Sequence, residues 1–191
     1  MCKFYSAIVM RNGDLLHNEN LTSHEDLIDL FGIKDSLGCC DKFVRVEFSP
    51  ENECDLPYIT KYKLRVDESQ TPDWFEKYRE LISQNLTTIV NRRIITGSHK
   101  ILTGGLYIVK DAQIDLLTQA VVIYMQNSSV NEMRENSSVN KMWGNSSVNE
   151  MRGNSSVNEM WENSSVNEML DNSSVNMMRD NSRAPKKPKL Q

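Results

Sequence analysis

The chain of 191 residues lacks the features by which several protein classes are recognised. It has no apolar run long enough for a membrane-spanning helix, which needs about 20 residues. Its N-terminus holds one early Lys and a short mixed apolar stretch, without the long apolar segment and cleavage site of a signal peptide. The net charge of −4 is too small to indicate a polyanionic partner. We therefore expect a soluble cytoplasmic protein that binds no membrane and does not bind nucleic acid directly.

Cysteine is scarce as well. The chain has four cysteines, and two of them are adjacent: Cys2, Cys39, Cys40 and Cys54. Disulfide-built secreted domains are small and dense in cysteine, so reduced thiols are the simpler interpretation. No Cys-x-x-Cys motif occurs, and the three histidines do not have the spacing of a zinc site. Neither a metal nor a cofactor is predicted.

The sequence also lacks the common catalytic motifs, including phosphate-binding glycine loops and the nucleophile elbow. Residues 23–26, Ser-His-Glu-Asp, join a nucleophile, a base and carboxylates, but capping explains these residue types better at a helix start. Cys2 as an N-terminal nucleophile is the other candidate, and the bulky residues that follow it disfavour this role. We predict no catalytic residues.

The few glycines and prolines mark turns and helix ends in the first half of the chain. Asn12-Gly13 follows a segment of β-formers and predicts a hairpin. Thr22 and Glu25 form a capping box for a helix that ends at Gly32. Residues 43–48 and 62–66 alternate between apolar and polar side chains, which predicts two paired strands.

A longer helix is expected downstream of these strands. Thr71 as N-cap and Pro72 at the first helical position begin it, and apolar residues at helical spacing continue to Ile89. Short strands are expected at residues 94–95 and 100–103, around Gly97. Together these elements predict a small α+β domain over residues 1–105.

A nonapeptide, Asn-Ser-Ser-Val-Asn-Glu-Met-x-x, dominates the rest of the sequence and is repeated six times over residues 127–180. On an α-helix nine residues turn through about 900°, so successive copies would point to opposite sides and form no apolar stripe. A β-solenoid remains, in which Ser and Val point inward and Met fills a corner. Residues 111–117 and 120–125 resemble degenerate copies, so the predicted solenoid covers residues 106–182.

A second period is visible at the eighth position of the repeat, where Arg and Trp alternate over the first four copies. This alternation predicts coils of two nonapeptides, and thus three coils for the six copies. Since coils stack about 4.8 Å apart, Trp143 is expected over Trp161 on one face. The other face is expected to carry Arg134, Arg152, Glu132, Glu150 and Glu168. Asn residues at fixed positions favour amide ladders between coils.

These two faces are the candidate binding surfaces of the chain. Exposed Trp and Arg are typical of binding hot spots, although packing of Trp for the stability of the solenoid is the alternative explanation. Residues 183–191 are predicted to form a basic, flexible tail. Charge and proline protect strand edges, so either this tail blocks the edge of the last coil or the last coil pairs with a second chain.

The chain resembles a family of uncharacterised phage, prophage and gut-bacterial proteins. The likeness lies in three segments: Phe43-Val44-Arg45-Val46-Glu47, the pair Leu64-Arg65-Val66-Asp67 and Thr71-Pro72-Asp73-Trp74-Phe75, and the Asn-Ser-Ser-Val-Asn-Glu-Met tail. The resemblance implies an origin in a mobile element, a bacterial cytoplasm as location and the two-part architecture. It implies no catalytic residues.

The favoured hypothesis for function is a non-enzymatic protein that binds a protein or ribonucleoprotein complex of the host. An inhibitor of a host defence nuclease, such as an anti-CRISPR protein, is its concrete form. The first alternative is a small enzyme within residues 1–105, with the solenoid as an oligomerisation device. The second alternative is a structural or assembly protein that associates with itself through the solenoid end.

Overall fold

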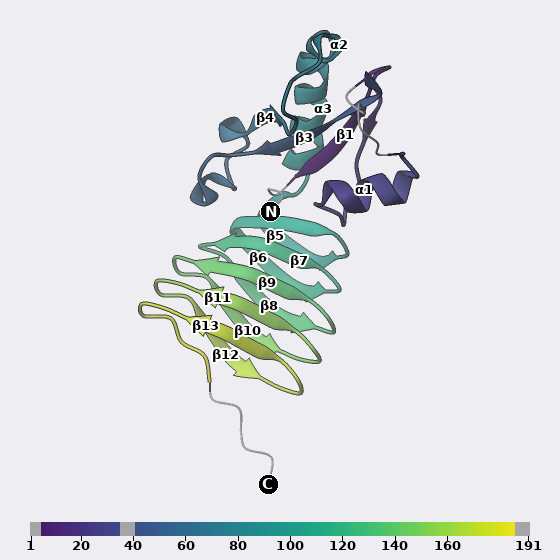
Figure 1. Ribbon diagram of the computed structural model, residues 1–191. Helices are drawn as coiled ribbons and strands as arrows, with labels where there is room; N and C mark the ends of the chain where they lie inside the picture. Colours follow the sequence, from purple (N-terminus) through teal and green to yellow (C-terminus); the bar gives the residue numbers. More distant parts are fainter. Residues whose placement is uncertain (1–4, 35–40, 186–191) are drawn as a thin grey trace. The chain divides into compact units, whose positions relative to one another are not determined.

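The computed structural model describes residues 5–34 and 41–185 of the chain (Figure 1). It divides into two compact units, residues 1–92 and 93–191. The first is a small α/β part, and the second contains a β-solenoid of about five turns over residues 94–178. The boundary precedes the one at residue 105 that the sequence indicated, because the strand at Ile94–Thr103 pairs within the solenoid sheet.

The first unit contains a four-stranded antiparallel sheet in the order β2-β1-β3-β4. Its strands are β1 (Ser6–Met10), β2 (Leu15–Leu16), β3 (Phe43–Ser49) and β4 (Lys63–Val66). Its helices are α1 (His24–Phe31), α2 (Asp73–Glu76) and α3 (Arg79–Asn91), and two short 3-10 turns lie at Glu53–Asp55 and Ile59–Lys61.

The hairpin and the strand pair that the sequence predicts are both present. Val9 pairs with Leu15 across a turn in which Gly13 has a φ of 94°, a conformation that disfavours other residues. Val46 of β3 pairs with Val66 of β4. One small cluster of buried apolar side chains joins α1 to this sheet, namely Ile8, Leu27, Ile28 and Phe43.

The start of α1 differs from the expected capping box by one residue. Ser23, not Thr22, is the N-cap, and its hydroxyl accepts a hydrogen bond from the backbone N–H of Asp26. The Ser23 hydroxyl also donates to the carboxylate of Glu25 at 2.8 Å. The helix ends as predicted at Gly32, which is in the left-handed conformation with a φ of 63°.

The single long helix expected from Thr71 onward is wrong, because the structure has two helices. Pro72 is the N-cap of α2, and Tyr78 separates α2 from α3. Arg79 spans the break: its guanidinium donates twice to the carboxylate of Glu76 and lies 5.0 Å from the centre of the Phe75 ring. The apolar stripe itself is as predicted, with Phe75, Ile82 and Leu86 fully buried.

The solenoid consists of parallel strands that wind around one apolar interior. Its strands are β5 (Ile94–Thr103), β6 (Leu106–Thr118), β7 (Val121–Gln126), β8 (Ser129–Arg134), β9 (Ser138–Trp143), β10 (Ser147–Met151), β11 (Ser156–Met160), β12 (Ser165–Met169) and β13 (Ser174–Met178). The strands β8, β10 and β12 form one side, and β7, β9, β11 and β13 form the other. The long β6 joins the sides, because its first half pairs with β7 and its second half with β8.

The segment at residues 94–103, expected as two short strands, is one strand. The register of β5 against β6 shifts between Ile95 and Gly97, and Gly97 has a φ of 75°. A β-bulge at this glycine therefore replaces the expected break, since glycine adopts this backbone conformation without a steric cost.

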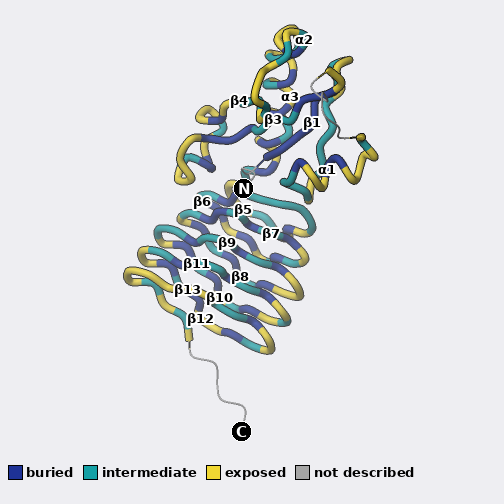
Figure 2. The backbone as a smooth tube through the Cα atoms, viewed as in Figure 1, coloured by how far each residue is buried: buried dark blue, intermediate teal, exposed yellow. Residues whose placement is uncertain are grey.

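The interior of the solenoid is built from three repeat positions, as the sequence predicts. The first Ser, the Val and the Met of the nonapeptide are buried in the first five copies; in the copy that begins at Asn145 these are Ser146, Val148 and Met151, each fully buried. Figure 2 shows the buried segments that recur along the solenoid. Buried Ser hydroxyls donate to backbone carbonyl groups at the turns, as Ser146 does to Trp143 at 2.6 Å. Ser128, Ser137 and Ser173 donate in the same way, which lowers the cost of their burial, whereas the hydroxyls of Ser155 and Ser164 are buried without a partner among the described residues.

Each turn of the repeat region is made at the ninth position of the nonapeptide. The residues there all have a positive φ between 51° and 67°: Glu135, Gly144, Gly153, Glu162, Asp171 and Asp180. Glycine adopts this conformation without a steric cost, whereas L-residues with a side chain rarely do. The ninth position, which the sequence pattern left undefined, is thus the corner that turns the chain.

Candidate binding surface on the solenoid

Asn side chains form hydrogen-bonded ladders along the solenoid. The Asn at the fifth repeat position donates to the same position two copies earlier: Asn149 to Asn131, Asn167 to Asn149, Asn158 to Asn140 and Asn176 to Asn158. The partners are 18 residues apart, with donor–acceptor distances of 2.9–3.4 Å. The Asn at the first position forms equivalent ladders at the corners, for example Asn154 to Asn136 and Asn163 to Asn145. These bonds hold the outer faces in register.

One face, which we call the Trp face, is the outward side of β7, β9, β11 and β13. Trp143 and Trp161 stack here with ring centres 5.0 Å apart and an angle of 2° between the rings. Tyr124 stacks on Trp143 at 6.5 Å, and the guanidinium of Arg179 lies 4.6 Å from the centre of the Trp161 ring. The expected stack of two indoles is therefore the centre of a longer ladder, which ends in a cation–π contact.

The two indoles of this ladder differ in their hydrogen bonds. The indole N–H of Trp161 donates to Glu159 at 3.0 Å. Beside Trp143, the residue at the position of Glu159 is Lys141, its partner in the β9–β11 register. A Lys side chain has no acceptor oxygen, so it cannot accept from the indole. The indole N–H of Trp143 is buried and has no partner among the described residues. Both indoles are only partly buried, so part of each remains accessible on this face.

The opposite side, which we call the Glu–Arg face, is the outward side of β8, β10 and β12. Arg134 donates to both carboxylate oxygens of Glu132, and the Nε atom of Arg152 donates to Oε1 of Glu150 on the neighbouring strand β10. The Nε atom of Arg152 also lies 3.6 Å from Glu132, which links two coils. Glu168 is exposed, and its copy has Leu170 at the position of the Arg, so the column of paired charges ends there.

The charges on this face affect one another. The hydrogen bonds from Arg134 lower the pKa of Glu132 below the ordinary carboxyl value, and Arg152 adds to this effect through its charge. The Glu132 side chain is 19% exposed, whereas Arg134 and Arg152 are about half exposed. The carboxylates of Glu132 and Glu150 are thus paired with arginines of the same chain.

The structure places the seven candidate residues on the two outer sides of the solenoid. Trp143 and Trp161 lie on one side, whereas the five charged residues lie on the other. Sequence reasoning missed Tyr124 and Arg179, which extend the Trp ladder at its two ends. Arg179 was detectable, because it occupies the eighth repeat position in the coil after Trp161.

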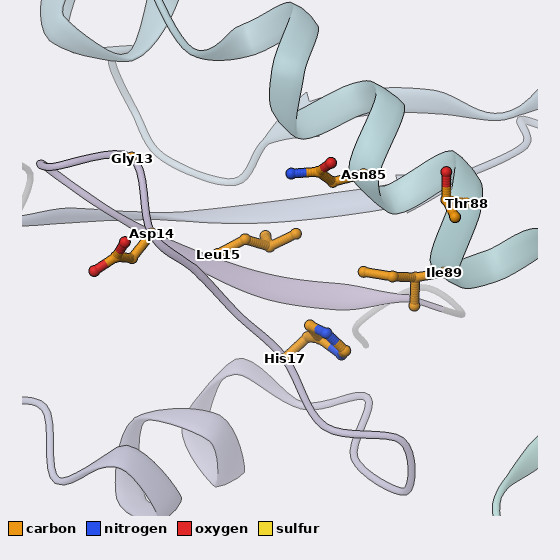
Figure 3. Close-up of a pocket in the computed structure, with 7 residues that line it drawn as sticks. All are labelled: Gly13, Asp14, Leu15, His17, Asn85, Thr88 and Ile89. Carbon is orange, nitrogen blue, oxygen red and sulfur yellow. The ribbon is translucent and has the colours of Figure 1, made fainter.

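The first unit has an open pocket of about 470 Å³ between the β1–β2 hairpin and α3 (Figure 3). Its lining is formed by Gly13, Asp14, Leu15, His17, Asn85, Thr88 and Ile89. His17 is engaged with the hydroxyl of Tyr5 at 3.0 Å, and Thr88 donates to the backbone of its own helix. Two of the polar side chains of this pocket, His17 and Thr88, therefore serve local structure.

The residues that were weighed for catalysis also have structural partners. His24 is buried, with Nε2 3.0 Å from the carbonyl oxygen of Val46 and Nδ1 3.3 Å from the carboxylate of Asp67. Ser23 caps α1, as described above. Cys2, Cys39 and Cys40 lie outside the described residues, and Cys54 is an exposed free thiol.

In the described part of the chain, no cluster of three or more His, Cys, Asp or Glu side chains is placed to hold a metal ion. No helix within residues 5–34 and 41–185 is long and apolar enough to cross a bilayer. Comparison of the chain with protein-family models, curated proteins and solved structures gave no match. Arguments about function therefore rest on the surface of the molecule itself.

Proposed function

We propose that this protein is a non-enzymatic binding protein whose Trp face contacts a protein or ribonucleoprotein complex. The observation that carries this proposal is the stacked pair Trp143 and Trp161, held between Tyr124 and Arg179 on a regular sheet surface. Trp and Arg are among the residues that dominate the energetics of protein interfaces. Tyr124 is 2% exposed and supports the stack from within the protein. Because stacking already fixes these rings, they lose little conformational entropy when a partner binds.

The Glu–Arg face is a weaker candidate for the same role. Its Arg side chains are paired with Glu side chains of the same chain, so a partner has to break these pairs or compete with them. Exposed ion pairs of this kind contribute little to affinity. On the Trp face the intrachain ion pair is confined to Lys141 and Glu159, and the exposed Arg179 and the accessible parts of the two indoles lie beside it.

We also propose that each coil of the regular region consists of two nonapeptides. The backbone pairs Ser129–Ser147 and Ser138–Ser156, and the Asn ladders with 18-residue spacing, support this unit. The alternation of Arg and Trp then sorts the two residue types onto different faces. In such a coil one nonapeptide contributes to the Trp face and the next contributes to the Glu–Arg face.

The concrete form of the proposal is an inhibitor of a host defence nuclease, acting in the bacterial cytoplasm. Its support is the resemblance to phage and prophage proteins in the repeat tail and in the segments around Val44 and Trp74. An inhibitor that acts by occupying a surface needs a rigid binding face and no chemistry of its own. The Trp face meets that requirement.

The test is partner capture from a bacterial lysate with the full chain and two double variants. Trp143→Ala with Trp161→Ala removes the ladder, and Arg134→Ala with Arg152→Ala is the matched control at the same repeat position on the other face. We expect a specific partner that the control retains and the Trp variant loses. Circular dichroism verifies that both variants keep the β-solenoid.

A purified CRISPR nuclease, assayed for DNA cleavage with micromolar protein, then tests the concrete form. Inhibition by the wild-type chain and by the Arg variant, but not by the Trp variant, is the expected result. The binding proposal fails if no specific partner is captured, or if both variants bind it equally well.

A further inference from the structure

The last coil of the solenoid leaves part of the apolar interior uncovered. Met178 of β13 occupies the seventh repeat position, where Met142 and Met160 are fully buried, yet it is 51% exposed. Val175 is only partly buried, whereas Val157 at the same position one coil earlier is fully buried. After β13 the described chain extends only to residue 185, and in this short segment Ala184 packs against the apolar interior.

The backbone at this end is unevenly covered. On the β12 side the chain continues the winding: Ser165 forms a parallel bridge with Arg183, and the N–H of Val166 donates to the carbonyl oxygen of Arg183 at 2.8 Å. Pro185 follows, and proline cannot donate to a strand ladder. In the described part of the chain, β13 pairs with β11 on one side and with no strand on its other side.

The sequence of β13 departs from the repeat where a charge would protect this edge. The sixth position is Glu in four copies and Lys141 in another, but it is Met177 in the last copy. Met177 is 42% exposed. Open strand edges are normally protected by charged side chains. Here the terminal strand instead gains an exposed apolar side chain beside the uncovered Val175 and Met178.

We infer that a second copy of this chain covers the terminal coil, with the two β13 strands paired antiparallel about a two-fold axis. Such pairing satisfies the open N–H and C=O groups of both edges and buries Val175 and Met178 of each copy against those of the other. It explains why the protective charge is absent from β13 alone.

Self-complementarity favours a second copy over an unrelated partner. In the ladder through Asn140 and Asn158, each amide oxygen accepts from the coil that follows it. Asn176 ends this ladder, so no following coil donates to its oxygen; one N–H of its amide group is bonded to Asn158, and the other N–H is the donor that the same residue of a second copy can offer to this oxygen. The apolar side chains of β13 likewise meet their own kind. This inference is independent of the proposed function, because it uses the end of the solenoid and not its Trp face.

Sedimentation of the full chain over the micromolar range tests the inference. We expect a monomer–dimer equilibrium in the wild type. Met177→Glu restores the residue of the repeat and places a carboxylate at the edge, so it is expected to raise the dimer dissociation constant at least about tenfold. Met177→Leu keeps the site apolar and is expected to retain the dimer.

Restoring the repeat residue leaves the fold intact, and thermal melting of both variants at high dilution verifies this. A wild-type chain that stays monomeric overturns the inference. So does association that Met177→Glu leaves unchanged, or a series of species that continues beyond the dimer, because a head-to-tail contact is open-ended.

Discussion

At the scale of single residues, the nonapeptide assigns one physical task to each position. The buried Ser caps backbone groups at a turn, Val and Met fill the core, and Asn joins the ladders. The ninth position turns the chain with a positive φ. At Gly153 a Cβ atom would lie 3.0 Å from the backbone nitrogen of Glu135, which explains glycine in that copy. The eighth position is free of these tasks and carries the residues that distinguish the two faces.

The charge pair at Glu132 yields a pH-dependent prediction. Because its pKa is lowered in the folded state, the ionised carboxylate stabilises the fold above the ordinary carboxyl pKa of 4.5, and this contribution is lost as the pH falls through the lowered value. Glu132→Gln is expected to lower the melting temperature by about 1–2 °C at pH 7.

The difference between the wild type and Glu132→Gln is expected to vanish in acid, where the carboxylate is protonated. Glu168→Gln is the matched control, since Leu170 stands at the position of its Arg and no effect is expected at either pH. A difference that grows toward low pH would show that the pair does not stabilise the folded state.

At the scale of secondary structure elements, the proposed unit of the solenoid is a coil of two nonapeptides. The stack of Trp143 on Trp161 requires that the two residues occupy equivalent positions of successive coils on one side. Since the first five copies have the same residue types at their buried positions, one of these copies can replace another without a change in the core. With two nonapeptides to a coil, two residues at the same repeat position lie on one face when they are an even number of nonapeptides apart, and on opposite faces when this number is odd.

Two deletions of equal length test this unit. Removal of residues 145–153 brings the two Trp residues one nonapeptide apart and is expected to place them on opposite sides of the solenoid. Removal of residues 163–171 keeps their spacing and is the control. The exciton signal of the stacked indoles in circular dichroism is expected to persist in the control and to disappear in the first deletion. If both deletions kept the signal, the coil of two nonapeptides would be wrong.

At the scale of the whole molecule, the sequence predicts the solenoid well because its period is regular. The spacing of apolar residues in the sequence likewise predicted the buried stripe of α3 and the strand pair β3–β4. The start of α1 and the break before α3 were not, because several residues near each end qualify as caps and tertiary packing selects among them. The path of β5 was missed since its sequence lacks the nonapeptide, although it pairs with β6 over most of its length.

The candidate surface was predictable only in part. The alternation of Arg and Trp indicated the two faces, but Tyr124 has no fixed place in the nonapeptide pattern and its contact with Trp143 needed the three-dimensional structure. The exposed end at Met178 also required the structure, because the same residue type is buried in every earlier coil of the repeat region. Burial and its loss are properties of neighbours, which a repeat pattern alone does not specify for its last copy.

The most direct test of the central claim is side-chain footprinting of the complex with the captured partner. Hydroxyl radicals oxidise accessible side chains, and mass spectrometry reports the rate at each residue with and without the partner. The account predicts slower oxidation of Trp143 and Trp161 in the complex and unchanged rates on the Glu–Arg face. Unchanged rates at both Trp residues, with protection confined to the Glu–Arg face or to the first unit, would contradict it.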